Sequence, residues 1–149
     1  MKLQINDTQY ININTHLLIA GSSGSGKSVS LHALILSAME QGYKLALVDP
    51  KRVELSFYKN INNLLLPIAK NAEQAESVIN NIYDLMESRY KKMDRLEQRQ
   101  SEETPILLVI DEFAELIEQN KKLMQTIERI ASLGRACNIH LILSTQYPI

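Results

Sequence analysis

The sequence has little of what would place it in several common classes of protein. It contains one cysteine, Cys137, among 149 residues, so no disulfide can form within the chain and a reducing compartment is expected. Neither sign of charge dominates, since 16 Lys and Arg stand against 17 Asp and Glu. This balance argues against a free-standing basic nucleic-acid module. It leaves room for DNA contact through one small surface that is repeated around an oligomer.

Long hydrophobic runs are also missing. The longest apolar stretches, residues 64–69 and 106–110, are far shorter than the ~20 residues that span a bilayer. The first ten residues, MKLQINDTQY, lack the apolar region of a secretory signal. No repeat and no Gly-, Ser- or Pro-rich linker divides the chain, and 45% of its residues are hydrophobic. A single cytoplasmic domain over residues 1–149, without membrane insertion, is therefore expected.

Short apolar runs alternate with helical patterns along the chain. Buried strands are predicted at 16–20, 45–48, 106–110 and 139–144. Helices are predicted at 28–41, about 72–99, and 112–132, the last as one helix or two. A small hairpin or edge strand is predicted at 3–5 and 10–13. Strands that alternate with helices need crossover connections, so the predicted class is α/β, with a mainly parallel sheet and helices on both faces.

A phosphate-binding loop lies between the first predicted strand and the first long helix. The pattern G-x-x-x-x-G-K-[ST] is filled by Gly21, Ser22, Ser23, Gly24, Ser25, Gly26, Lys27 and Ser28. Glycines let backbone N–H groups surround phosphate oxygens, and the following helix points its positive end at the same anion. Lys27 would reach the β- and γ-phosphates, and the Ser28 hydroxyl would bind Mg²⁺. The alternative is a turn that only joins a strand to a helix.

A pair of carboxylates follows the third predicted strand. Asp111 and Glu112 come directly after residues 106–110, and ligands of open α/β sheets gather at this edge. Asp111 is assigned to the metal ion and Glu112 to orienting the attacking water. The alternative is that the pair caps the next helix, and both interpretations can hold together. The polar triplet Ser144-Thr145-Gln146 closes the fourth strand, and one of its side chains could contact the γ-phosphate or the water, with a simple polar turn as the alternative.

Basic residues gather near the end of the long predicted helix, at Arg89, Lys91, Lys92, Arg95 and Arg99. Two interpretations stay open for this strip, a solvated helix face and a surface that contacts DNA or a neighbouring subunit. His16 and His140 are expected to be packing residues beside the strands, and Cys137 a small core residue.

Taken in order, these motifs resemble the FtsK/SpoIIIE-type DNA-translocase motors. The resemblance rests on five blocks: HLLIAGSSGSGKS at 16–28, LVDPKRVELSFY at 47–58, RYKKM at 89–93, LLVIDEFAEL at 107–116 and GRACNIHLILSTQ at 134–146. Together they extend over almost the whole chain. The block that contains Asp49-Pro50-Lys51 and the block that ends in Thr145-Gln146 are much more specific than a phosphate-binding loop alone.

The resemblance implies a RecA-like P-loop core with strand order 2-3-4-1 and a ring, usually a hexamer, that uses ATP and Mg²⁺ to pump double-stranded DNA. Lys27 and Ser28 match the family's Walker A pair, and Asp111 and Glu112 its Walker B pair. Gln146 matches the residue that senses the γ-phosphate. Arg135 matches an arginine finger supplied to a neighbour's nucleotide, with a helix-end arginine as the alternative.

The expected function is therefore that of an ATP-dependent double-stranded DNA translocase core. The same family membership fits an ATPase of conjugation, genome packaging or type VII protein secretion. A non-enzymatic alternative is a nucleotide-binding module that assembles a ring without turnover of its own. Because family motors continue beyond the Thr-Gln strand, the chain is expected to be a minimal or truncated core, without a membrane segment or winged-helix domain, and a partner protein could supply missing segments.

Overall fold

A computed structural model describes residues 2–4, 10–12, 16–21 and 26–146 of the chain. The strands are β1 (Lys2–Gln4), β2 (Tyr10–Asn12), β3 (Leu17–Ala20), β4 (Lys44–Val48), β5 (Ile106–Ile110) and β6 (Ile139–Thr145). The α-helices are α1 (Lys27–Glu40), α2 (Ala72–Arg95), α3 (Phe113–Gln119) and α4 (Lys122–Leu133), and short 3₁₀ turns lie at Ser56–Tyr58 and Arg135–Cys137. The pattern at 112–132 therefore forms two helices.

Four parallel strands form the main sheet, in the order β3-β6-β5-β4. Numbered along the chain as the first to fourth strands of this sheet, they lie in the order 2-3-4-1 when read from β4, which confirms the predicted topology. The strands that precede the phosphate loop and the acidic pair, β3 and β5, are separated by β6. The predicted hairpin is a separate antiparallel pair of β1 and β2, in which Leu3 lies opposite Ile11.

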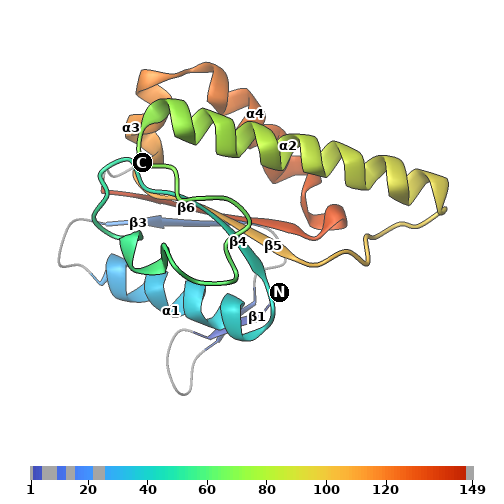
Figure 1. The fold of residues 1–149 in the computed structure, drawn as a ribbon, viewed down its shortest axis with the longest axis horizontal. Coiled ribbons are helices and arrows are strands. Elements are labelled where there is room, and N and C mark those ends of the chain that lie inside the picture. Colours follow the sequence, from blue (N-terminus) through green and yellow to red (C-terminus); the bar gives the residue numbers. More distant parts are fainter. Residues whose placement is uncertain (1, 5–9, 13–15, 22–25, 147–149) are drawn as a thin grey trace.

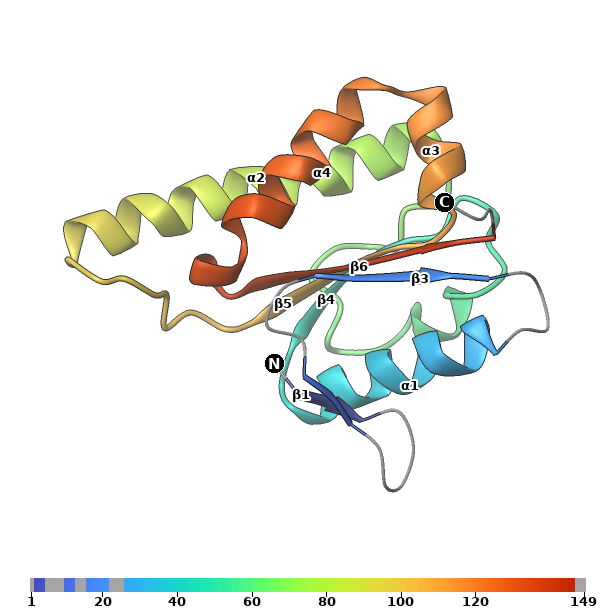
Figure 2. The same cartoon turned by 180° about the vertical axis from the view of Figure 1, so that it is seen from behind.

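Helices cover both faces of this sheet. Figure 1 shows α1 on one side and α2, α3 and α4 on the other, and Figure 2 shows the same layers from behind. The side chains of β5 alternate between the two layers, as the pleat requires. Leu107 and Val109 belong to the core on the α1 side, whereas Leu108 and Ile110 belong to the core under α2 and α4. All of β5 is at most 1% exposed, so this strand fixes the centre of the domain.

The two edges of the main sheet differ. Beyond β4, the segment 63–69 runs alongside the strand, where Leu65 N–H donates to Leu45 O at 2.8 Å and Ala69 N–H to Leu47 O at 3.0 Å. These bonds cover the polar groups that an edge strand would otherwise expose. At the opposite edge β3 pairs with β6 alone among the described strands, and Leu18 is 47% exposed. The prediction that this strand is buried is therefore wrong in part, because an apolar run does not reveal a strand's position within the sheet.

Helix α2 has a defined beginning and end. The Asn71 side chain accepts a hydrogen bond from Gln74 N–H at 2.8 Å, and the Gln74 side chain accepts one from Lys70 N–H at 2.9 Å, a variant of the capping box. The helix ends at Arg95 rather than at the predicted residue 99. Glu97 takes a left-handed conformation with φ of 55°, and Gln98 N–H donates to Met93 O at 2.8 Å. This is the hydrogen bonding of a Schellman motif, which stops the helix.

Arg89 is not part of a solvated or DNA-facing strip. It is 8% exposed, and its guanidinium donates to Cys137 O at 2.8 Å and to Thr104 O at 2.7 Å. It therefore ties α2 to the segments that lead into β6 and β5. Lys92 forms an ion pair with Glu103, while Lys91 and Arg95 are exposed. Of the predicted basic strip, the exposed residues Lys91, Arg95 and Arg99 therefore remain available to a partner.

The described helices contain no segment that has both the length and the hydropathy to cross a bilayer. The expected packing roles of two residues are confirmed. Cys137 is fully buried and its Sγ lies 3.7 Å from Met86 O, and burial raises the pKa of its thiol to about 11. His140 is 5% exposed and packs against the ring of Tyr43, with the ring centroids 5.9 Å apart.

Candidate nucleotide-binding site

Most of the predicted site residues that the structure describes lie at the carboxyl ends of β3, β5 and β6. In the parallel register Ala20 lies beside Thr145, and Ile110 beside Leu143. Gly21 N–H then donates to Thr145 O at 3.1 Å, which holds the start of the phosphate loop against the end of β6. The first turn of α1 and the acidic pair after β5 are therefore brought to one edge of the sheet, where open α/β folds bind their ligands.

The described part of the phosphate loop contains Gly21, Gly26, Lys27 and Ser28, whereas Ser22, Ser23, Gly24 and Ser25 lie outside the described residues. Gly26 has φ of +91°, a conformation that favours glycine, and its carbonyl accepts the first helical hydrogen bond, from Ser30 N–H at 3.0 Å. A Cβ at this position would meet no atom within 4 Å. The left-handed backbone conformation, and not a lack of room for a side chain, therefore requires glycine at this position.

Lys27 lies between the two predicted carboxylates. Its Nζ is 3.3 Å from Asp111 Oδ1 and 3.7 Å from Glu112 Oε1. All three residues are buried, with 7% of Lys27 and 2% of each acid exposed. Two buried negative charges and one positive charge leave this group with a net negative charge, which a divalent cation would compensate.

Asp111 has a further partner that the sequence analysis did not predict. The hydroxyl of Ser144, a fully buried residue of β6, donates to Asp111 Oδ1 at 2.5 Å. The polar triplet at the end of β6 was predicted to contribute through Gln146. Gln146 is exposed at the end of the strand and follows Thr145, the partner of Gly21, so it stays at the same edge of the sheet.

Glu112 stands at the N-cap position of α3 in a left-handed conformation, with φ of 54° and ψ of 43°. Its side chain makes no capping hydrogen bond, so the capping alternative does not describe Glu112. Its Oε1 faces Lys27, and its Oε2 is buried without a hydrogen-bond partner within the described part of the chain. Backbone strain of this kind and an unsatisfied buried oxygen are typical of functional carboxylates.

Ser28 and Asp111 fit the expected magnesium ion by the chemistry of their donors. Both offer oxygen atoms, the ligands that Mg²⁺ prefers. The described residues contain no group of three or more His, Cys, Asp and Glu side chains that could hold a metal by themselves. Because Mg²⁺ in nucleotide sites is held by one or two protein oxygens plus phosphates and water, this sparse donor set agrees with the expected ion.

Arg135 lies away from this site in its own chain. It is exposed in the 3₁₀ turn that precedes the amino end of β6, whereas the site lies at the carboxyl end of the same strand. At about 3.3 Å per residue, the seven residues of β6 separate the two ends by about 20 Å. Arg135 therefore does not join Lys27, Asp111 and Glu112 within one chain.

The segment after β4 contributes a residue that the sequence analysis did not single out. Glu54 Oε1 accepts a 2.7 Å hydrogen bond from the Ser28 hydroxyl. In the same segment, Lys51 Nζ lies 3.3 Å from Glu115 Oε2. The signal for Glu54 was present in the block at 47–58, but no periodicity or spacing connects that block to the phosphate loop.

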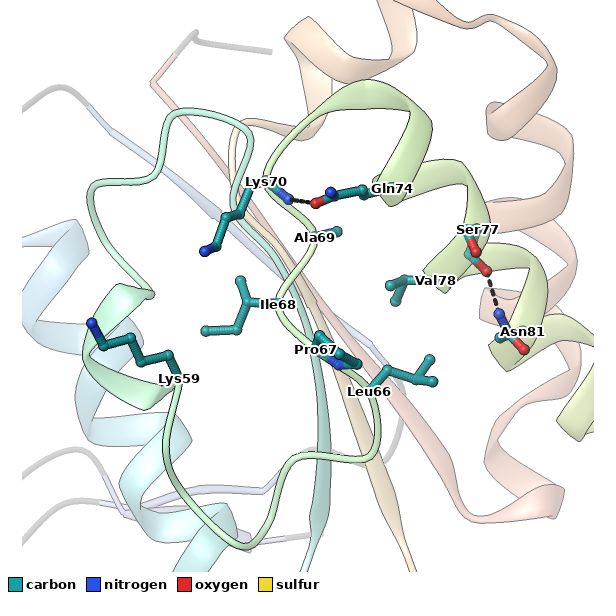
Figure 3. Close-up of a pocket in the computed structure, with 10 residues that line it drawn as sticks. All are labelled: Lys59, Leu66, Pro67, Ile68, Ala69, Lys70, Gln74, Ser77, Val78 and Asn81. Carbon is teal, nitrogen blue, oxygen red and sulfur yellow. Dashed lines mark hydrogen bonds between the residues drawn. The ribbon is translucent and has the colours of Figure 1, made fainter.

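A separate cavity of about 470 Å³ lies between the segment 59–70 and α2 (Figure 3). Figure 3 shows Lys59 on the side away from α2, Lys70 beside Gln74 at the start of α2, and Val78 of α2 across the opening. None of the predicted site residues that the structure describes lines this cavity. The strand-end site and this cavity are therefore distinct features.

Comparison with known proteins shows which family the chain resembles. The sequence pattern of the FtsK/SpoIIIE family matches residues 4–106. A protein named DNA translocase FtsK from Staphylococcus epidermidis is 36% identical over 162 aligned positions, which cover 93% of this chain and 20% of that protein. One from Treponema pallidum is 39% identical over 153 positions, covering 89% of this chain and 19% of that protein. The chain thus spans about a fifth of the length of these relatives.

Solved structures share the fold. The pCW3 conjugation coupling protein TcpA, in a monomer form with ATPγS, superimposes with a TM-score of 0.83 at 25% identity, over 100% of this chain and 48% of that one. EssC (ATPases 2 and 3) from Geobacillus thermodenitrificans gives 0.81 at 18% identity, over 93% of this chain and 30% of that one. With the family pattern matching well over half of its residues and translocase relatives aligned along most of its length, this chain belongs to the FtsK/SpoIIIE family.

Proposed function

We propose that the chain is the ATP-hydrolysing core of a motor that moves double-stranded DNA. The observation that carries the proposal is the placement of Lys27 between Asp111 and Glu112, beside the phosphate-loop strand. A buried lysine and two carboxylates at this edge are the groups that phosphoryl transfer from ATP to water requires. DNA as the cargo is supported by the two relatives named DNA translocase FtsK.

Each side chain has a chemical role in this proposal. Lys27 neutralises charge that develops on the γ-phosphoryl group. Glu112 orients the attacking water, because its Oε2 is buried, has no hydrogen-bond partner among the described residues and can accept one. Ser28 and Asp111 would hold Mg²⁺, which when bound offsets the charge of the β- and γ-phosphates. Gln146, which directly follows β6 at the same edge of the sheet, contacts the γ-phosphate.

Arg135 acts on a neighbouring subunit in the proposed assembly, a homo-oligomeric ring around DNA with the family's usual six subunits. Support comes from the distance of about 20 Å along β6 that separates Arg135 from the site of its own chain. An exposed arginine at this position can reach only another chain's nucleotide. A site completed by two subunits turns over only after assembly, which links hydrolysis to the ring.

Two alternatives rest on specific observations. A role in conjugation is supported by the conjugation coupling protein TcpA, whose structure superimposes on the whole chain at 25% identity. A nucleotide-binding assembly module without turnover of its own is supported by the position of Arg135, which lies away from the nucleotide site of the same chain. The described residues carry no observation that favours genome packaging or type VII protein secretion.

Steady-state ATP hydrolysis, measured over a range of protein concentrations with and without long double-stranded DNA, tests the proposal. We expect turnover that rises more than in proportion to protein concentration and increases with DNA. Glu112→Gln should reduce turnover by at least about 100-fold, since it removes the water-orienting carboxylate. The matched control is Glu118→Gln, on the exposed side of α3, which should leave turnover unchanged.

Nucleotide binding without turnover at every protein concentration, with or without DNA, would contradict the motor and favour the assembly module. Turnover that responds to a secretion-signal peptide but not to DNA would contradict DNA as the cargo and indicate a protein cargo. Equal loss of activity in Glu112→Gln and Glu118→Gln would contradict the assigned role of Glu112.

A further inference from the structure

Glu54 touches the phosphate-loop serine, although 26 residues separate the two in sequence. Its Oε1 accepts the Ser28 hydroxyl hydrogen at 2.7 Å, and its side chain is 26% exposed. The residue lies in the segment between β4 and the 3₁₀ turn Ser56–Tyr58. No role in the proposed hydrolysis has so far been given to it.

The backbone on both sides of Glu54 is fixed by a buried aspartate. Asp49, at the end of β4, is 1% exposed; its carbonyl accepts from Arg52 N–H at 3.1 Å and its Oδ2 from Leu55 N–H at 3.0 Å. Leu55 is fully buried in the core on the α1 side. Because the segment is held at its start and directly after Glu54, the carboxylate is presented to Ser28 with little freedom to move away.

The second oxygen of Glu54 is also occupied. His32 Nε2 lies 3.4 Å from Glu54 Oε2, and His32 Nδ1 lies 2.6 Å from the Tyr58 hydroxyl. Burial raises the pKa of Tyr58, so its hydroxyl keeps its proton and can donate to Nδ1. In the tautomer in which Nδ1 accepts from Tyr58, Nε2 carries the hydrogen that faces Glu54. Ser28, Glu54, His32 and Tyr58 thus form one connected polar chain beside α1.

The direction of the hydrogen bond between Ser28 and Glu54 determines whether the Ser28 oxygen can bind a cation. A serine hydroxyl has one hydrogen and two acceptor lone pairs. With the hydrogen donated to Glu54, both lone pairs remain available to a cation. Asp111, the other carboxylate of the site, is already bonded by Lys27 and Ser144 through Oδ1. Glu54 is therefore the carboxylate that accepts from Ser28 in this structure.

We propose that Glu54 is a positioning residue, which holds the Ser28 hydroxyl with its lone pairs available to the Mg²⁺ that accompanies the nucleotide. The proposal rests on the function proposed above, because it assumes a magnesium nucleotide at Ser28. An outer carboxylate that accepts a hydrogen bond from a metal ligand makes that ligand a better donor, and loss of such a partner typically costs 10–100-fold in metal affinity.

Equilibrium binding of a fluorescent, slowly hydrolysed ATP analogue to the full chain tests this, in saturating Mg²⁺ and in excess EDTA. The measured quantity is the ratio of the two dissociation constants. We expect Glu54→Ala to reduce the Mg²⁺-dependent gain in affinity by about tenfold while leaving the EDTA affinity within about twofold. Glu54→Gln, which keeps an acceptor oxygen without the charge, should fall between the wild type and Glu54→Ala. Exposed Glu118→Ala is the matched control.

A double-mutant cycle separates positioning from folding. Ser28→Ala should lose the same Mg²⁺-dependent gain, and adding Glu54→Ala to it should cost nothing more, because Glu54 acts only through Ser28. Additive losses, or an equal loss of affinity in EDTA, would overturn the proposal by identifying a structural role. An unchanged ratio in Glu54→Ala would overturn it as well, and a tighter Mg²⁺ complex would do so by revealing competition with the metal.

The outcomes for this inference and for the proposed function are distinct. A wild-type chain that binds the analogue in a Mg²⁺- and Glu54-dependent way but never hydrolyses ATP contradicts the motor and supports the positioning role. A chain that hydrolyses ATP with an unchanged ratio in Glu54→Ala supports the motor and contradicts the positioning role. A wild-type chain that binds no analogue in either buffer overturns both.

Discussion

Ser144 and Asp111 are joined by a 2.5 Å hydrogen bond between the neighbouring strands β6 and β5. The hydroxyl of Ser144 donates to the oxygen that also faces Lys27, so Asp111 Oδ1 has two donors. This bond fixes the orientation of the acid at the end of the central strand, and neither motif in the sequence predicts it.

Ser144→Ala should lower the free energy of unfolding by about 2 kcal/mol, because it removes a buried hydrogen bond to a charged acceptor. It should also weaken magnesium-nucleotide binding by loosening Asp111. Denaturant unfolding and equilibrium binding measure the two effects. Ser132→Ala is the control, since Ser132 is exposed on α4 and should change stability by less than about 0.5 kcal/mol. Equal stability of the two variants would contradict the assigned bond.

Arg89→Met should destabilise the fold by about 3 kcal/mol without changing nucleotide affinity. The variant leaves Cys137 O and Thr104 O without their buried donor, at a distance from the phosphate loop. Arg95→Met, at the exposed end of the same helix, should have little effect on stability. Unfolding of the two variants at the same denaturant concentration would contradict the buried position of Arg89.

Acid should weaken the fold through His140. Burial is the main cause that lowers the pKa of His140 from 6.5 to about 4, so the folded chain keeps this ring neutral. Below pH 6.5 the unfolded chain takes up a proton that the folded chain resists, and stability falls as the pH drops from 6.5 towards 4. Burial also lowers the pKa of His16, which acts in the same direction.

His140→Gln removes this titration, so its loss of stability across that pH range should be smaller than that of the wild type by on the order of 2 kcal/mol. Urea unfolding at a series of pH values measures the difference. Above pH 6.5 the two stability curves should run parallel, because the ring is neutral in both states there. Identical slopes below pH 6.5 would show that His140 titrates normally.

Arg135→Ala and Glu112→Gln should each be inactive alone and active when mixed. If Arg135 serves a neighbour's site, a mixed assembly contains interfaces in which one subunit keeps Glu112 and the next keeps Arg135. Random mixing in equal amounts should restore about a quarter of wild-type ATP turnover, since one interface type in four combines both intact residues. A mixture as inactive as its components would contradict the action of Arg135 on another chain.

The sequence predicted the features that depend on local pattern. The strand at 106–110 was predicted with its observed ends, because an uninterrupted apolar run lies between Pro105 and Asp111. The phosphate-loop pattern and the acidic pair are likewise formed by adjacent residues, so the sequence alone indicates them. The parallel topology then places Lys27 beside Asp111. Each of these follows from residues that are adjacent in sequence or from the rule that parallel strands end at one edge.

The features that it missed depend on tertiary contacts. A solvated face was one of the two interpretations for Arg89, because composition does not reveal that its guanidinium donates hydrogen bonds to two carbonyl groups. Glu54 was overlooked because an irregular segment, without periodicity, brings it to Ser28. The end of α2 was misplaced by four residues, since Glu97 adopts a left-handed conformation that a glutamate does not signal. Leu18 was predicted to be buried because hydropathy does not distinguish an edge strand from a central one.

Helix α1 joins two parts of the molecule that are otherwise far apart. Its first turn carries Lys27 and Ser28, and its other end lies against the β1–β2 hairpin (Figures 1 and 2). At 1.5 Å per residue, its 14 residues form a rod about 21 Å long. Because the helix is continuous, it gives the N-terminal hairpin a direct structural connection to the turn that carries Lys27 and Ser28.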